Sequence, residues 1–174
     1  MRTIIALFAA CIFTLTACDK INELLTFEIK DDFTFTIPST VGLNVPTNIP
    51  TPSIPTSIEE GVIGNNTSAD LIKDITLKQM SFQITNPASA NFNFLESVHL
   101  YISADGLEEK LVAYMDNVPD GLTTLELITI TDPLDAYIKQ STYDIRADIV
   151  TDELILQDTD IKGNFTFDVT ADPL

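Results

Sequence analysis

Tryptophan is absent from this 174-residue chain, and histidine and cysteine are scarce, with one and two copies. The single His99 excludes a histidine-rich metal cluster, and the six scattered glycines form no glycine-rich phosphate-binding motif. Basic residues are also few: nine Lys and Arg stand against 26 Asp and Glu, for a formal net charge of −17. Nucleic-acid binding needs a basic surface that releases counterions, so neither DNA nor RNA is expected as a partner.

Long apolar runs are missing too, apart from an uncharged stretch over residues 4–15. This stretch is shorter than the roughly 20 residues that a transmembrane helix needs. Arg2 precedes it, and Leu-Thr-Ala-Cys follows at residues 15–18. This order of features is typical of a signal peptide: a short basic start, an apolar run and a small residue before the cleavage site. It predicts a signal peptide over residues 1–17.

The Leu-Thr-Ala-Cys sequence at residues 15–18 resembles the lipobox of bacterial lipoproteins. The resemblance implies that Cys18 becomes the mature N-terminus and carries a diacylglyceryl group, with a fatty acid such as palmitate on its amino group. The alternative is an ordinary signal peptide with an incidental cysteine. Cys11 would leave with the signal, so the mature body would have no disulfide to stabilise it. The expected location is the bacterial cell envelope, with the outer membrane preferred and the leaflet left open.

The mature part is expected to comprise a lipidated tether over residues 18–23 and one domain over residues 24–174. It holds all 26 acids and eight bases, a net charge of −18, so an anionic membrane surface would repel it. Within it, the segments 85–87, 94–97, 101–106 and 134–139 resemble small exported lipoproteins of Bacteroidota. That resemblance extends over residues 66–174 and implies a lineage without an assigned function.

Alternating apolar and polar residues, separated by turn signals every 8–12 residues, predict an all-β fold. We expect an immunoglobulin-like antiparallel β-sandwich of seven to eight strands, with a closed barrel as the alternative. One short helix is predicted over residues 132–140, with Asp132 as its N-cap and Pro133 as its first residue. The proline-rich segment 38–55 is expected to be extended along a sheet edge or to form a semi-rigid linker. A change of phase near Gln79 indicates a bulge, and Gly163 indicates a bulge or bend.

Carboxylates carry most of the candidate chemistry. Asp152, Glu153, Asp158 and Asp160 lie within nine residues and are weak candidates for calcium ligands. The segment from Asp158 resembles an EF-hand loop, but Lys162 occupies a position where a ligand is needed. A solvated acidic surface is the simpler interpretation. His99 is predicted on the polar face of a strand, opposite its apolar neighbours, rather than in a catalytic or metal site.

These observations predict a lipid-anchored, non-enzymatic protein that binds or scaffolds an unknown envelope protein, without a required cofactor. Two alternatives stay open: a hydrolase that uses acidic residues, and a carrier of an apolar ligand between the two sheets. Two carboxylates facing each other in a cleft would favour the hydrolase, and a hollow core would favour the carrier.

Overall fold

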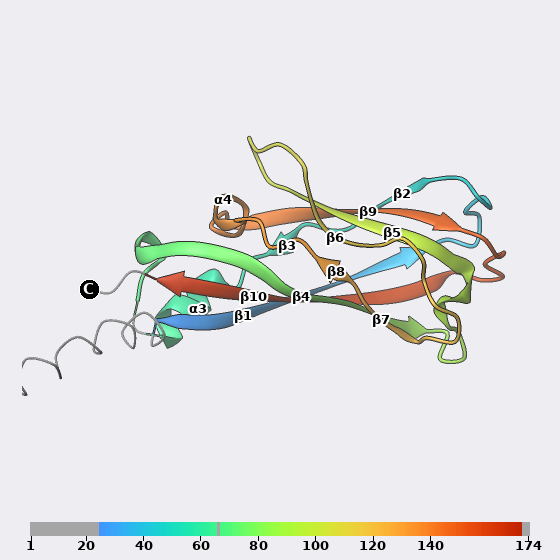
Figure 1. The fold of residues 1–174 in the computed structure, drawn as a ribbon, viewed down its shortest axis with the longest axis horizontal. Helices are drawn as coiled ribbons and strands as arrows, with labels where there is room; N and C mark the ends of the chain where they lie inside the picture. The colour runs from blue at the N-terminus through green and yellow to red at the C-terminus, as the bar shows by residue number, and fades with distance from the viewer. Residues whose placement is uncertain (1–24, 66, 172–174) are drawn as a thin grey trace, which may run out of the picture.

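A computed structural model describes residues 25–65 and 67–171, which form two antiparallel sheets packed face to face (Figure 1). The predicted signal peptide, the tether and Cys18 lie outside the described residues. The all-β sandwich is confirmed. Among the described residues, no helix has the length and apolar character needed to cross a membrane.

The four-stranded sheet contains the first and the last strand of the chain as neighbours. Its order is β1 (Thr26–Ile37), β10 (Thr159–Ala171), β4 (Ile72–Asn86) and β7 (Thr124–Glu126). In β10, alternate residues point into the core, as expected for a strand with one buried face. Because β1 and β10 are antiparallel, the start of β1 and the end of β10 lie at the same end of the sandwich (Figure 1).

The six-stranded sheet is built around β9 and β5. Its strands, in the order β2, β9, β5, β6, β8, are Thr47–Pro50, Thr142–Thr151, Leu95–Ser103, Lys110–Met115 and Ile128–Thr129. The short strand β3 (Ile54–Pro55) also pairs with β9. The described residues thus form ten strands, more than the seven to eight expected, because several pairings involve only two to four residues.

Chain crossings close both sides of the sandwich. On one side, β7 and β8 are separated only by Leu127, so the chain passes directly from one sheet to the other. On the other side, the proline-rich segment leaves β1, forms β2 and β3 along the edge of the second sheet, and leads into helix α3 (Ile58–Gly64). Within the segment 38–55, Thr47–Pro50 and Ile54–Pro55 lie extended along this edge, whereas residues 38–46 form a loop that contains turns. Such crossings protect sheet edges from pairing with other chains.

Phenylalanine rings fill much of the space between the sheets. The ring centroids of Phe33 and Phe165 are 5.3 Å apart, and those of Phe35 and Phe82 are 5.2 Å apart. Gly163 pairs in regular register with Phe33 on one side and Phe82 on the other, so the predicted bulge or bend at this residue is wrong. Its missing side chain instead leaves room for the Phe33 ring, whose Cζ would lie 2.5 Å from a Cβ at this position.

The predicted bulge near Gln79 is confirmed. Gln79 pairs with Thr166, whereas the next pair joins Leu77 to Phe167, which leaves Lys78 as the extra residue of β4. The shift restores the inward direction of the apolar side chains on both sides of the bulge.

The helix predicted over residues 132–140 is shorter in the structure. Helix α4 spans Asp135–Ile138, and its N-cap is Leu134 rather than Asp132. Leu134 has a φ of −121°, outside the helical region, and its backbone N–H donates to the Ile75 carbonyl of β4 at 2.8 Å. The longer helix α3 was not predicted. Two 3₁₀ turns, η1 (Ala69–Leu71) and η2 (Phe92–Phe94), complete the described elements.

Candidate functional site

Four loops meet at the end of the sandwich opposite the start of β1, the right-hand end in Figure 1. We call this surface the loop end and define it by residues 38–46, 87–94, 116–123 and 152–158. Loops far apart in the sequence meet here because β1, β4, β6 and β9 all finish at this end.

Backbone hydrogen bonds join these loops into one surface. The Asn44 N–H donates to the Thr151 carbonyl at 2.7 Å, and the Thr151 hydroxyl donates to the Gly42 carbonyl at 3.1 Å. The Asp152 N–H donates to the Phe94 carbonyl at 3.1 Å. These contacts order the loops before any ligand binds, which lowers the entropic cost of binding.

The fourth loop is attached in the same way. The Phe92 N–H donates to the Leu122 carbonyl at 2.8 Å, and the Gly121 N–H donates to the Asn93 side-chain oxygen at 2.6 Å. Residues 116–123 therefore form part of the same surface as residues 87–94.

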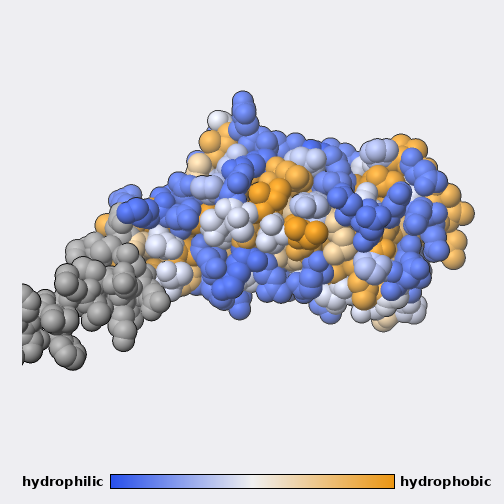
Figure 2. Space-filling model, viewed as in Figure 1, coloured by the Kyte–Doolittle hydropathy of each residue, from blue (hydrophilic) through white to orange (hydrophobic). Residues whose placement is uncertain are grey.

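Exposed apolar side chains concentrate on the loop end. Seven large hydrophobic residues are exposed among the described residues, and five of them lie here: Leu43, Val45, Leu122, Leu154 and Leu156. Leu156 is 91% exposed and Leu154 is 66% exposed. Figure 2 shows apolar residues at this end, as well as in the middle of the same face. Apolar patches of this kind mark interaction surfaces more often than scattered single residues do.

A shallow depression lies beside the most exposed leucines. Its apolar lining includes Pro87, Ala90 and Phe94 from one loop, and Leu154 and Leu156 from another. The loop end therefore offers both projecting apolar side chains and a concave surface between two loops.

The charge of the loop end is entirely negative. Its four loops contain no Lys, Arg or His, and they carry five acids: Asp116, Asp120, Asp152, Glu153 and Asp158.

Two of the four candidate calcium ligands, Asp158 and Asp160, accept hydrogen bonds from other residues of the protein. Oδ1 of Asp158 accepts from the Ser39 backbone N–H at 2.8 Å and from its hydroxyl at 2.9 Å. These two bonds lower the pKa of Asp158.

Asp160 also accepts hydrogen bonds within the protein. Its carboxylate takes one from the Thr36 hydroxyl at 2.7 Å and one from the Asn86 side-chain amide at 3.2 Å. Asp152 and Glu153 are exposed in the loop after β9. Among the described residues, no group of three or more His, Cys, Asp or Glu is arranged to hold a metal ion, so the four candidates are not brought together.

His99 lies on the outer face of the six-stranded sheet, as its alternation with apolar neighbours predicts. Its Nε2 is 3.1 Å from an Asp116 carboxylate oxygen, and its ring stacks on that of Tyr114. On the same face, the Arg146 guanidinium lies 4.3 Å from the Tyr101 ring centroid.

Arg146 forms the centre of a charged cluster that sequence reasoning missed. It donates to both carboxylate oxygens of Glu109, at 2.7 and 2.6 Å, and it also pairs with Asp148. The Arg146 contacts lower the pKa of Glu109. A bidentate pair of this geometry holds the hairpin before β6 against β9. All three nitrogens of the Arg146 guanidinium therefore donate hydrogen bonds to carboxylates of the protein.

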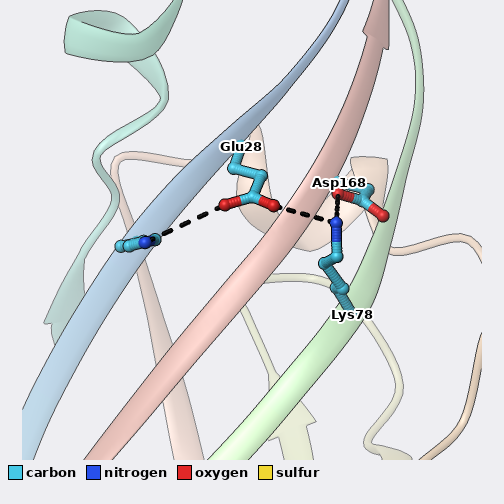
Figure 3. A network of polar contacts seen from close by, with 4 residues as sticks. Glu28, Lys78 and Asp168 are labelled. Atoms are coloured by element: carbon cyan, nitrogen blue, oxygen red, sulfur yellow. Dashed lines mark hydrogen bonds and ion pairs between the residues drawn. The ribbon is translucent and has the colours of Figure 1, made fainter.

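The outer face of the four-stranded sheet carries a similar ion-pair network (Figure 3). Lys78, the bulged residue of β4, donates to Glu28 at 2.8 Å and to Asp168 at 3.1 Å. The hydrogen bond from Lys78 lowers the pKa of Glu28, and the bonds to both acids raise the pKa of Lys78. These exposed pairs join β1, β10 and β4 across the sheet.

Asp31 is the one buried acid among the described residues, and sequence reasoning missed it. The sequence contained a signal for its burial, because Asp31 lies between Ile29 and Phe33 on the inward-facing side of β1. The carboxylate accepts from the Ser57 N–H at 3.1 Å and from the Tyr143 hydroxyl at 3.0 Å. Burial, followed by the charge of Asp31 and the bond to it, strongly raises the pKa of Tyr143.

Comparisons with known proteins add little to these observations. No protein-family model matches the chain, and no curated protein matches it in sequence. Among solved structures, the chain is similar to one described as Desmodium yellow mottle tymovirus. The two share 9% identity over 85% of this chain and 90% of the other, with a TM-score of 0.28.

Proposed function

We propose that the protein is a lipid-anchored, non-enzymatic binding protein of the bacterial cell envelope, with the outer membrane as the preferred location. Cys18 in the lipobox-like sequence of residues 15–18 is the proposed attachment point. The observation that supports a binding role is the concentration of exposed apolar side chains on the loop end.

The placement of the loop end suits an anchored protein. β1 begins at Thr26, eight positions after Cys18, so the connection cannot span more than about 30 Å. β1 has 12 residues and extends about 40 Å toward the loop end. An anchor at Cys18 would therefore keep the start of β1 near the membrane and leave the loop end facing away from it.

The two alternative functions have less support. A hydrolase with paired acids would need two carboxylates that face each other, whereas the buried Asp31 faces Tyr143 and Ser57. A carrier would need space between the sheets, whereas phenylalanine rings occupy that space with centroids 5.2–6.4 Å apart.

Intact mass of the native protein tests the proposal. We expect a chain that starts at Cys18 and carries additional acyl mass, and we expect Cys18→Ser to lack that mass and to keep its signal peptide uncleaved. Cys11→Ser is the matched control and should leave processing unchanged. An unmodified residue 18, or a mature chain that starts elsewhere, would contradict the lipid anchor.

A further inference from the structure

The loop end combines exposed apolar side chains with a charge of one sign. Leu154 and Leu156 project from the loop after β9, and Asp152 and Glu153 precede them directly. Leu43 and Val45 project from the neighbouring loop on either side of Asn44, whose positive φ of 54° makes the chain turn there. Asparagine tolerates this left-handed conformation better than most residues. A turn at this point presents both apolar side chains to solvent.

The negative charge of the loop end disfavours some of the partners that could bind an exposed apolar surface. A second copy of the chain would bring another five acids against the first five, and like charges in an interface oppose association. An anionic membrane surface would be repelled in the same way, since the four loops contain no basic residue. A partner that supplies both positive charge and apolar side chains would satisfy both features.

We propose that the loop end docks a segment of another protein that carries cationic and apolar side chains together. Apolar side chains of the segment would contact Leu154, Leu156 and the adjacent depression. Its Lys or Arg residues would pair with Asp152 and Glu153. This inference rests on the proposed binding role, but it is tested at the loop end and not at the lipid, so the two can fail separately.

The test uses the native chain in detergent and a displayed library of random 12-residue peptides. Peptides are selected on the wild-type protein after removal of those that bind the Leu154→Ser/Leu156→Ser double variant. Both leucines are exposed, so the double variant is expected to keep its fold and melting temperature. Selected peptides should have a net positive charge and at least two large apolar residues.

Affinities of the selected peptides then separate the two features. The double leucine variant should bind about tenfold more weakly or worse. Ile63→Ser removes an equally exposed apolar residue from α3, away from the loop end, and should leave the dissociation constant unchanged. Asp152→Asn/Glu153→Gln should weaken binding and reduce its salt dependence, whereas Glu59→Gln/Glu60→Gln on α3 should change neither.

Other outcomes would overturn the proposal. Selection of acidic or neutral peptides, or equal binding by the leucine variant, would show that the loop end does not recognise a cationic apolar segment. Self-association that Leu156→Ser abolishes would identify a second copy as the occupant. Binding of the Cys18→Ser chain to zwitterionic phosphatidylcholine vesicles, lost in the leucine variant, would identify a lipid surface.

Discussion

Gly163 shows how closely a single position in this core is filled. It lies in β10 between Phe33 and Phe82, and a Cβ there would overlap the Phe33 ring. We expect Gly163→Ala to lower the free energy of unfolding by about 1–3 kcal/mol, because the added methyl group displaces a packed aromatic ring. Denaturant unfolding at neutral pH measures the change.

Gly42→Ala is the matched control, because a Cβ at that position meets nothing within 4 Å. Its stability should be unchanged or raised by about 0.5 kcal/mol. The double variant Phe33→Leu/Gly163→Ala should cost less than the two single changes together, since the smaller side chain relieves the overlap. Additive costs would show that the Phe33 ring is not the source of the strain.

Tyr143 gives the protein a pH dependence on the alkaline side. Its raised pKa keeps the folded phenol neutral where the unfolded phenol, with a pKa of about 10, ionises. The stability contribution is therefore complete below about pH 10 and is lost as the pH rises further, by about 1.4 kcal/mol per pH unit. Tyr143→Phe should decline less steeply above pH 10 in denaturant unfolding.

The same variant should be less stable at pH 7, by about 1–3 kcal/mol, because the buried Asp31 loses one of its two hydrogen bonds. Tyr114→Phe, on the outer face of the six-stranded sheet, is the control for loss of a phenolic hydroxyl. An alkaline decline as steep as that of the wild type would show that Tyr143 does not cause it.

At the scale of elements, the long strands could be predicted because each has one buried face. The alternation of β1, β9 and β10 is visible in the sequence, and the bulge at Lys78 appears there as a change of phase. Strands as short as β3 and β8 cannot be recognised in the sequence, because two residues are too few to show an alternating pattern.

Helix α3 could not be predicted from the sequence because packing against the rest of the protein stabilises it, and not its own helix propensity. Gly61 and Gly64 weaken its helix propensity, so packing must stabilise it. Ile58 and Val62 are buried, and Gly61 lets the helix approach Ile29 of β1. The start of α4 was misplaced because Leu134, which is hydrogen-bonded to β4, does not have helical backbone angles.

The candidate site was only partly predictable. The acids of residues 152–160 are plain in the sequence, but the partners that occupy Asp158 and Asp160 come from residues more than 70 positions away. The loop end likewise exists only once the strands bring its four loops together. The sequence therefore predicted acidic loops, but not the exposed apolar surface that the same loops form together.

The net charge of the whole molecule predicts a response to salt. A formal charge of −17 makes the folded chain repel itself, and ions screen that repulsion beyond about 8 Å at physiological ionic strength. We expect the melting temperature to rise as sodium chloride is added. Calcium at matched ionic strength should add little, because the bonds from Ser39, Thr36 and Asn86 already engage Asp158 and Asp160.

Thermal unfolding monitored by circular dichroism, with sodium chloride and calcium chloride compared at equal ionic strength, measures both effects. A saturable stabilisation by calcium that Asp158→Asn removes would establish a metal site in these acids. A melting temperature that does not respond to sodium chloride would contradict the expected self-repulsion.

The pairing of the first strand with the last has a consequence for the order of synthesis. β1 has no neighbour in its sheet other than β10, which the ribosome makes after every other described element. The four-stranded sheet therefore cannot be completed before β10 has been made, and such distant pairing makes folding slow. For the exported protein proposed above, this delay would keep the nascent chain extended enough to thread through a translocation pore before it folds.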